Sequence, residues 1–274
     1  MATYNPPPRI ELPPRPELMA ALKQGFLLGS AVLVLMLPPD GTGLHRARFF
    51  AGPALHVPIP VQLGGPRFAD FRGEAASAEA RHIADWVADS GDNRRLPYVI
   101  LDKRNARVFV FDAQGVLLGA TPVLLGAAAG DDSVVGIGNR AIADVRPEER
   151  TTPAGRFGAE PGRNASGEDV LWVDYNAAVS MHRVRAIEPS ERRLERLASP
   201  TAADNRISYG CINVPVRFYE DVVRGTFRYS RGIVYVLPEV KPLANVFASY
   251  DVARRHGQAR TRTLQLRPVT APRV

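Results

Sequence analysis

The sequence is poor in cysteine and histidine. Its 274 residues include one Cys, Cys211, and five His. A single Cys excludes an intrachain disulfide, and it also excludes zinc sites with several thiolates and iron–sulfur clusters held by this chain alone. The thiol of Cys211 is therefore either a small buried hydrophobic group or a reactive one.

Signatures of nucleotide and metal binding are also missing. The sequence has no phosphate-cradling Gly-rich loop, no dinucleotide fingerprint, no cluster with metal-ligand spacing and no internal repeat. We therefore expect no cofactor and no metal. What is present is a globular composition, because 45% of the residues are hydrophobic and 23% are charged. Such a chain can bury a sizeable core as one or two domains.

Positive charge is concentrated at the C-terminus. Residues 241–274 contain seven Lys and Arg against one acidic residue, which is +6 of the formal net charge of +7. A basic tail attracts nucleic acid, anionic lipid or anionic cell-wall polymer. No aromatic interleaving and no recognisable nucleic-acid-binding module accompany it, so we expect no nucleic-acid partner and favour a solvated, partly disordered extension.

The N-terminal region, residues 1–37, begins with a Pro-rich stretch that is typical of extended polyproline-type chain. Residues 25–37 then form a run of 13 residues without a charge, closed by two prolines. This run fits the apolar part of an export signal, whereas the longer segment that starts at Leu18, with Lys23 near its basic end, has the ~20 residues that span a bilayer. No small-x-small cleavage site follows Leu37, which favours an uncleaved membrane anchor over a cleaved signal peptide; a buried cytosolic helix is the third alternative.

Residues 38–95 are predicted to be a linker followed by one helix. The linker is rich in Pro and Gly, and the helix is capped by Ser77 and ends at Ser90-Gly91. From Leu96 the hydrophobic period changes to two, which predicts a mainly β domain over residues 96–240. Its predicted strands are residues 96–102, 107–112, 116–125, 170–174, 178–184 and 232–237, the first three as a β-meander, and its short helices are residues 190–198 and 216–224.

Cys211 lies in the segment Ser-Tyr-Gly-Cys-Ile-Asn-Val-Pro, residues 208–215, just before a predicted helix. The N–H groups and partial positive charge of a helix N-terminus favour a thiolate, which is the form a nucleophile needs. Gly210 lets the backbone approach a substrate closely, and the amides of Gly210 and Cys211 are candidates for an oxyanion hole. The alternative is a buried, unreactive Cys.

A thiol nucleophile needs a base, and His182 is the best candidate among the five histidines. It ends an apolar predicted strand, so folding can bring it beside Cys211. An imidazole there can take the thiol proton or pair with the thiolate, and later protonate a leaving amine. Without the Cys segment, a satisfied core or edge histidine would be the better interpretation.

Three separated features together resemble the L,D-transpeptidase (YkuD-type) family. They are the Thr-Pro-x-Gly-x-Phe element at residues 152–157, His182 after a hydrophobic strand, and the Ser-x-Gly-Cys-x-Asn signature at residues 208–213. The resemblance covers about residues 96–238. It implies a mainly β, sandwich- or barrel-like catalytic domain with a few short helices, preceded here by the hydrophobic N-terminal segment.

The resemblance also implies a cysteine acyltransferase that acts on peptidoglycan stem peptides in the periplasm or elsewhere outside the cytoplasmic membrane. Cys211 is then the nucleophile, His182 the general base and acid, and Gly210 with Cys211 the oxyanion donors. Ser208 and Asn213 match motif positions that order the loop. We assign Ser208 to the predicted catalytic residues and Asn213 to the predicted substrate-binding residues.

Three aromatic residues are candidates for contact with the substrate. Trp172 and Tyr175 are candidates to line a substrate groove, although aromatic residues on a strand more often belong to the core. Tyr209 occupies the position where the family usually has His, and a phenol cannot supply the charge of an imidazolium near neutral pH. We expect weaker electrostatic support for the thiolate from this position.

The interval between His182 and Cys211 is longer than is usual in the family, through a charged insert around residues 191–196. The insert is either a surface helix or lid, or a solvated loop. Two alternatives to transpeptidation stay open: an L,D-carboxypeptidase or peptidase that uses the same acyl-enzyme, and a module that binds wall peptide without turnover, for which Tyr209 is the main support.

Overall fold

The structure is a computed structural model that describes residues 65–265. The predicted anchor or signal segment, residues 1–37, lies outside the described residues, as do most of the predicted linker and residues 266–274. Between residues 65 and 265, no helix combines the length and the apolar character needed to cross a membrane.

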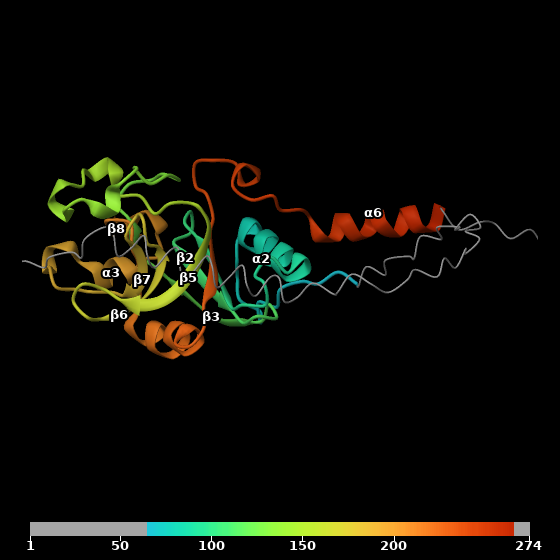
Figure 1. The fold of residues 1–274 in the computed structure, drawn as a ribbon, viewed down its shortest axis with the longest axis horizontal. Helices are drawn as coiled ribbons and strands as arrows, with labels where there is room; N and C mark the ends of the chain where they lie inside the picture. The colour runs from blue at the N-terminus through green and yellow to red at the C-terminus, as the bar shows by residue number, and fades with distance from the viewer. Residues whose placement is uncertain (1–64, 266–274) are drawn as a thin grey trace, which may run out of the picture. The chain divides into compact units, whose positions relative to one another are not determined.

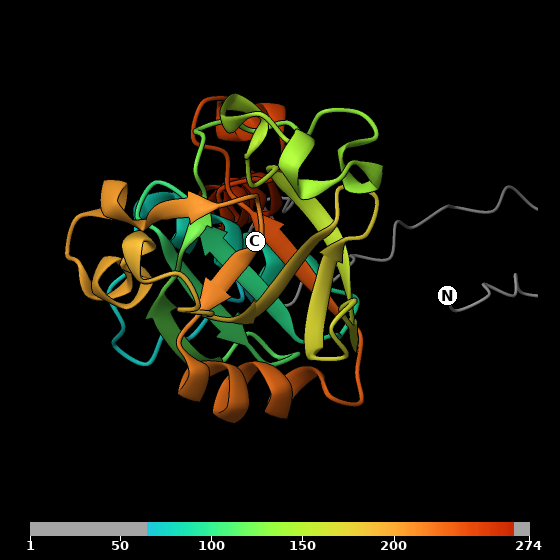
Figure 2. The ribbon, with the colours of Figure 1, turned by 90° about the vertical axis from the view of Figure 1, so that its left-hand side faces the viewer.

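The prediction of a mainly β fold is confirmed. Eight strands form one mixed, barrel-like sheet, and two short strands form a second sheet (Figures 1 and 2). In spatial order the large sheet comprises β3 (Leu117–Pro122), β2 (Arg107–Phe111), β1 (Tyr98–Asp102), β10 (Gly232–Val236), β5 (Gly155–Arg163), β6 (Asp169–Asp174), β7 (Val179–Arg183) and β9 (Ile212–Val214). The small sheet pairs β4 (Leu125–Gly126) with β8 (Arg206–Ser208).

The predicted meander is present, because β1, β2 and β3 pair antiparallel in chain order. The strand that joins the two halves of the sheet, β5, is missing from the predicted strands. The first half of β5 pairs with β10 and its second half with β6. Its sequence, GRFGAEPGR, is rich in Gly and contains Pro, both of which have low strand propensity, so only the tertiary pairing makes it a strand.

Both faces of the central strands are covered. Val99 and Leu101 of β1 belong to one hydrophobic cluster, and Tyr98 and Ile100 belong to another on the opposite face. The first cluster packs under a continuous helical segment made of α4 (Val216–Phe218), the π-helical η6 (Tyr219–Arg224) and α5 (Gly225–Phe227). The second packs under α2 (Ala78–Ser90), and Figure 1 shows these helices on different sides of the sheet.

The predicted helix at Ser77 is confirmed in its caps. The Ser77 side chain accepts a hydrogen bond from the Ala80 N–H, and Gly91 closes α2 in the left-handed conformation. The remaining helical pieces are short: η1 (Ile137–Asn139), η2 (Ile142–Asp144), η3 (Pro147–Glu149), η4 (Pro189–Glu191), α3 (Arg193–Ala198), η5 (Ala202–Asn205) and η7 (Leu243–Asn245).

The C-terminal region differs from the predicted solvated extension. Phe247 and Val252 are buried, and Phe247 packs in the cluster under α2. The Tyr250 hydroxyl donates to a carboxylate oxygen of Asp89 at 2.8 Å, and His256 Nε2 lies 3.0 Å from the same carboxyl group. These contacts tie the start of helix α6 (Val252–Gln265) to α2, so this part of the basic region belongs to the folded unit.

Candidate functional site

Strands β7 and β9 place the predicted nucleophile and base side by side. The two strands are parallel neighbours in which Met181 is opposite Ile212 and His182 is opposite Asn213. Met181 and Ile212 point into the core. Because side chains alternate along a strand, His182 and Cys211 lie together on the other face.

The sulfur of Cys211 has polar neighbours from β7 and from the turn before it. Sγ lies 3.8 Å from Ser180 Oγ and 3.6 Å from the carbonyl oxygen of Ala178, and the residue is partly exposed. Burial alone raises the pKa of the Cys211 thiol, but the hydrogen bond from His182 and its charge, with hydrogen bonds from Ser180, outweigh burial and lower that pKa. The surroundings favour the thiolate.

The orientation of His182 is set by the backbone of the next residue. Its Nδ1 lies 2.8 Å from the carbonyl oxygen of Arg183. A carbonyl can only accept, so Nδ1 carries the proton in the neutral ring. This leaves Nε2 as the nitrogen that can receive a proton from the Cys211 thiol.

The prediction that a helix N-terminus stabilises the Cys211 thiolate is wrong. Strand β9 follows Cys211 directly, and the helix begins only at Val216, after Pro215. Strand β9 is three residues long and pairs with β7, a non-local contact that the local sequence does not reveal. The imidazole of His182 therefore supplies the electrostatic support that was expected from the helix.

The turn between β8 and β9 uses one of the predicted oxyanion donors. The N–H of Gly210 donates to Ser208 Oγ at 3.1 Å, and the Ser208 hydroxyl donates to the carbonyl oxygen of Cys211 at 2.7 Å. The Gly210 N–H is thus occupied within the turn and is not a free oxyanion donor in this structure. Ser208 is buried and positions the turn.

Asn213 does not line an open surface, contrary to its predicted contact with substrate. Its side chain is 0% exposed. Nδ2 donates to the carbonyl oxygen of Cys211 at 3.2 Å, and Oδ1 accepts from Arg193 Nη1 at 2.9 Å. Asn213 therefore holds the Cys211 carbonyl, and Arg193 of helix α3, in the charged insert, ties the insert to the site.

Trp172 and Tyr175 lie on the same side of the sheet as the thiol. Trp172 is opposite Ser180 across β6 and β7, so its side chain shares a face with Ser180 and Cys211. The rings of Trp172 and Tyr175 are 5.0 Å apart at 62°, and Tyr175 is 77% exposed. Neither belongs to a core cluster, which favours the groove over the core interpretation.

Tyr209 contacts Arg150, a residue that was not among the predicted site residues. The guanidinium of Arg150 lies 4.1 Å from the centroid of the Tyr209 ring, and Tyr209 is 40% exposed. Arg150 precedes the Thr-Pro element by two residues, and this proximity to a motif is the one signal in the sequence that pointed to it.

The Thr-Pro element has a structural role. Thr152 is fully buried, and its hydroxyl donates to the carbonyl oxygen of Gly210 at 2.8 Å while accepting from the N–H of Gly126 at 2.9 Å. The element thus holds the turn that precedes Cys211.

A buried ion pair, absent from the prediction, anchors the same segment. Lys103 Nζ lies 2.7 Å from Asp131 Oδ1 and 2.8 Å from the carbonyl oxygen of Thr152. Burial raises the pKa of Asp131, but the hydrogen bond from Lys103 and three backbone N–H donors lower it far below its ordinary value. Asp131 therefore stays ionised and ties β1 to the loop that carries Thr152.

Comparison with known proteins gives a faint likeness. No family model matches the sequence, and no curated protein matches it. Solved structures similar to this chain are the NMR structure of the catalytic domain of the E. faecium L,D-transpeptidase, the Ldtfm-avibactam carbamoyl enzyme, and a Cys-to-Ser mutant of the Enterococcus faecium L,D-transpeptidase. Each is 16% identical over 52% of this chain, with TM-scores of 0.30, 0.29 and 0.27 and with 96%, 49% and 49% of the other chain covered. This likeness does not assign the chain to a family.

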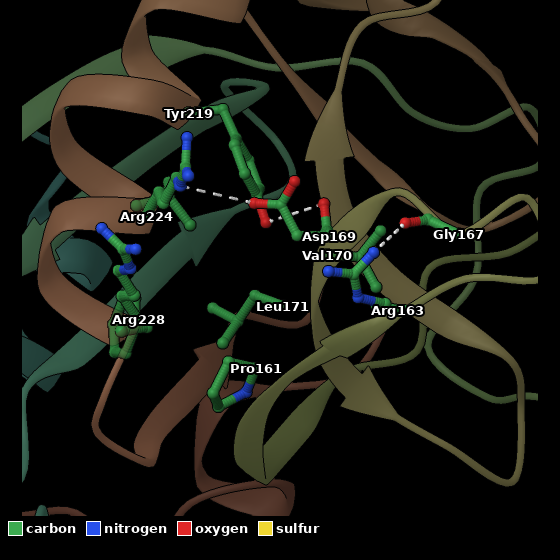
Figure 3. A pocket seen from close by; sticks show the side chains of 11 residues that line it. Pro161, Arg163, Gly167, Asp169, Val170, Leu171, Tyr219, Arg224 and Arg228 are labelled. Carbon is green, nitrogen blue, oxygen red and sulfur yellow. Dashed lines mark hydrogen bonds and ion pairs between the residues drawn. The ribbon is translucent and has the colours of Figure 1, made fainter.

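A separate cavity of about 270 Å³ lies between helix η6 and the β5–β6 hairpin (Figure 3). Its floor includes Leu171, which belongs to the core on the opposite face of β6 from Trp172. Asp169 at its rim is paired with Arg183 at 3.1 Å and with Arg224 at 3.8 Å. Cys211 does not line this cavity, so the candidate site is the face beside the thiol. No group of three or more His, Cys, Asp or Glu between residues 65 and 265 is arranged to hold a metal ion.

Replacing Gly210 with Ala is expected to destabilise the turn and displace Cys211. Gly210 has a φ of +128°, and an added Cβ would lie 2.7 Å from the carbonyl oxygen of Thr151. We expect a loss of about 1–3 kcal/mol in the free energy of unfolding, measured by denaturant titration, and slower alkylation of Cys211. Gly158→Ala is the control, because an added Cβ there meets nothing within 4 Å. Equal effects at the two positions would contradict the assigned role.

Proposed function

We propose that this protein is a cysteine acyltransferase acting on peptidoglycan stem peptides by L,D-transpeptidation. One observation carries the proposal: the partly exposed thiol of Cys211 lies beside the imidazole of His182, which lowers its pKa. The three motifs in their order along the sequence support the substrate class.

The reaction follows from the roles that this geometry permits. The thiolate of Cys211 attacks the carbonyl carbon of the amide between diaminopimelate and the terminal D-Ala, and a tetrahedral intermediate forms. His182, which holds the proton taken from the thiol at Nε2, protonates the leaving amine as the C–N bond breaks. An acceptor amine then attacks the thioester, gives its proton to His182, and the C–S bond breaks to restore the thiolate.

Two features of the surface suit a peptide substrate. Trp172 and Tyr175 offer an exposed aromatic wall on the same face as the thiol. For the tetrahedral intermediate, the N–H of Cys211 is the proposed oxyanion donor, since the N–H of Gly210 is bonded to Ser208. We further propose that the domain lies outside the cytoplasmic membrane, as the apolar run at residues 18–37 predicts; recovery of the protein with the cytosolic fraction of cells would contradict this location.

The first test is covalent labelling. Incubating the full-length protein with a carbapenem, whose lactam mimics the acyl donor, is expected to add one carbapenem mass to the intact protein and to the peptide that contains Cys211. The Cys211→Ser variant serves as the control and should stay unlabelled. A folded wild-type protein without adduct would favour the binding module over the enzyme.

The second test separates transfer from hydrolysis. A disaccharide tetrapeptide is supplied with and without an acceptor stem, and the products are identified by mass spectrometry. Cross-linked product supports the transpeptidase. Release of D-Ala with tripeptide alone, whether or not acceptor is present, would replace transpeptidation with carboxypeptidase activity.

A further inference from the structure

The loop between β4 and β5, residues 127–154, carries three arginines, two of which form ion pairs with carboxylates of the loop. Arg140 Nη1 and Arg146 Nη2 each lie 3.0 Å from a carboxylate oxygen of Glu149. Hydrogen bonds from Arg146 and Arg140 lower the pKa of Glu149 to about 2. Glu149 is therefore ionised and occupied by these two cations.

Arg150 is the third arginine of the loop, and it has no carboxylate partner in the part of the chain that the structure describes. Its guanidinium approaches the carbonyl oxygen of Val145, with Nη2 at 3.3 Å and Nε at 3.4 Å, and stacks on the ring of Tyr209 at 4.1 Å. Stacking fixes the plane of a guanidinium but leaves donors at its edge available to an anion.

This loop contacts two segments that lie next to the thiol. In one contact, the Thr151 carbonyl oxygen lies against Gly210, and Thr152 donates to the Gly210 carbonyl. In the other contact, Gly138 lies against the backbone of Asn176 and Ala178, and the Ala178 carbonyl is 3.6 Å from the sulfur of Cys211. The Arg150–Tyr209 pair thus joins this loop to the turn that carries Cys211, two residues from the nucleophile.

We propose that Arg150, held on Tyr209, binds the free α-carboxylate of the residue that leaves when the acyl-enzyme forms. The proposal rests on the proposed function and deepens it, because it names the residue that recognises the free end of the donor stem. That carboxylate lies one residue, about 3.5 Å, beyond the amide, and Tyr209 is two residues, at most about 7 Å, from Cys211. The two spans are compatible.

The pair also gives a physical reason for Tyr at position 209. A guanidinium is attracted to the neutral face of a phenol ring, whereas an imidazolium at the same position would repel it. Tyr209 therefore holds the Arg150 guanidinium, a permanent cation, two residues from Cys211. This guanidinium can form a bidentate pair with a carboxylate.

The test measures binding rather than turnover, in the full-length Cys211→Ser background so that the donor stays intact. A disaccharide tetrapeptide with a free C-terminal carboxylate and the same compound as its C-terminal amide are titrated by calorimetry. We expect the acid to bind about 10-fold or more tightly than the amide. Adding Arg150→Gln should remove this preference and Arg150→Lys should keep part of it, while Arg217→Gln, an exposed helix position, serves as the control.

Tyr209→Leu is the second variant, in case Arg150→Gln does not fold, and it should also reduce the preference for the acid because the stacking platform is lost. Equal binding of acid and amide before Arg150 is changed would overturn the proposal. So would a loss in Arg150→Gln that is the same for both compounds. Turnover by the unmodified protein is measured separately: carboxylate preference without any acylation would reject the proposed function and keep Arg150 as an anion-binding residue.

Discussion

Replacing His182 with Ala is expected to slow acylation of Cys211 by a carbapenem about 100- to 10,000-fold at neutral pH. The substitution removes both the hydrogen bond and the charge that lower the pKa of the thiol, and it leaves the burial that raises that pKa. It also removes the group that protonates the leaving amine. The expected loss therefore combines a smaller thiolate fraction with the absence of an acid.

The pH dependence separates these two contributions. Alkylation of Cys211 by neutral iodoacetamide reports the thiolate alone, and no other thiol competes because the sequence has one Cys. In the wild-type protein the rate should rise at a pH below the ~8.5 of free Cys. In His182→Ala the midpoint should move to higher pH.

His82→Ala is the matched control, because His82 lies on α2, away from Cys211, and is bonded to Ser249 at 2.9 Å. It should leave the alkylation profile unchanged. If His182→Ala keeps both the wild-type rate of acylation and the wild-type midpoint, His182 is not the base. A variant that keeps the rate of alkylation but loses acylation would show that His182 acts mainly as the acid.

The parts of the fold that the sequence predicted correctly are those with local signals. A period of two marked β1, β2, β6, β7 and β10, and the two caps marked α2. The pairing of His182 with Cys211 followed from placing His182 on a strand and Cys211 in a motif, and the parallel pairing of β7 with β9 brings them to one face.

The parts that the sequence did not predict depend on contacts between distant segments. Strand β5 has low strand propensity and forms because it lies between β10 and β6. Asn213 reads as a polar, accessible residue, yet Arg193 and the Cys211 carbonyl satisfy it in the interior. No local pattern distinguishes Arg150 from the other charged residues of its loop, and only the packing of that loop against Gly210 places it on Tyr209.

The ion pair of Lys103 and Asp131 belongs to the same class, since nothing local marks two charged residues for burial. Lys103 is 0% exposed at its side chain and Asp131 is 1% exposed. Replacing Asp131 with Ala removes the nearest anion of the buried Lys103 ammonium, which keeps Glu239 Oε1 at 3.4 Å, and it leaves three backbone N–H donors without their acceptor. We expect the free energy of unfolding at pH 7 to fall by about 3–5 kcal/mol, measured by urea titration.

The neighbouring Asp132 provides the control, because its side chain is 73% exposed and its ion pair with Lys241 lies at the surface. Asp132→Ala should change the free energy of unfolding by no more than about 1 kcal/mol. Equal losses in the two variants would mean that the buried ion pair contributes no more to the free energy of unfolding than the surface ion pair does.

Lowering the pH should reduce the free energy of unfolding of the wild-type protein through protonation of the Asp131 carboxylate. The folded pKa of Asp131 is lowered below its unfolded value, so its contribution to stability is complete above the unfolded pKa of about 3.9 and is lost as the pH falls through the folded value. Asp131→Asn should be less stable at pH 7 and should lose less on acidification. Because Lys103 also holds the Thr152 carbonyl, and Thr152 holds Gly210, loosening this pair should slow alkylation of Cys211 even in protein that remains folded. An unchanged alkylation rate in folded Asp131→Asn would separate the ion pair from the site and leave it a purely structural anchor.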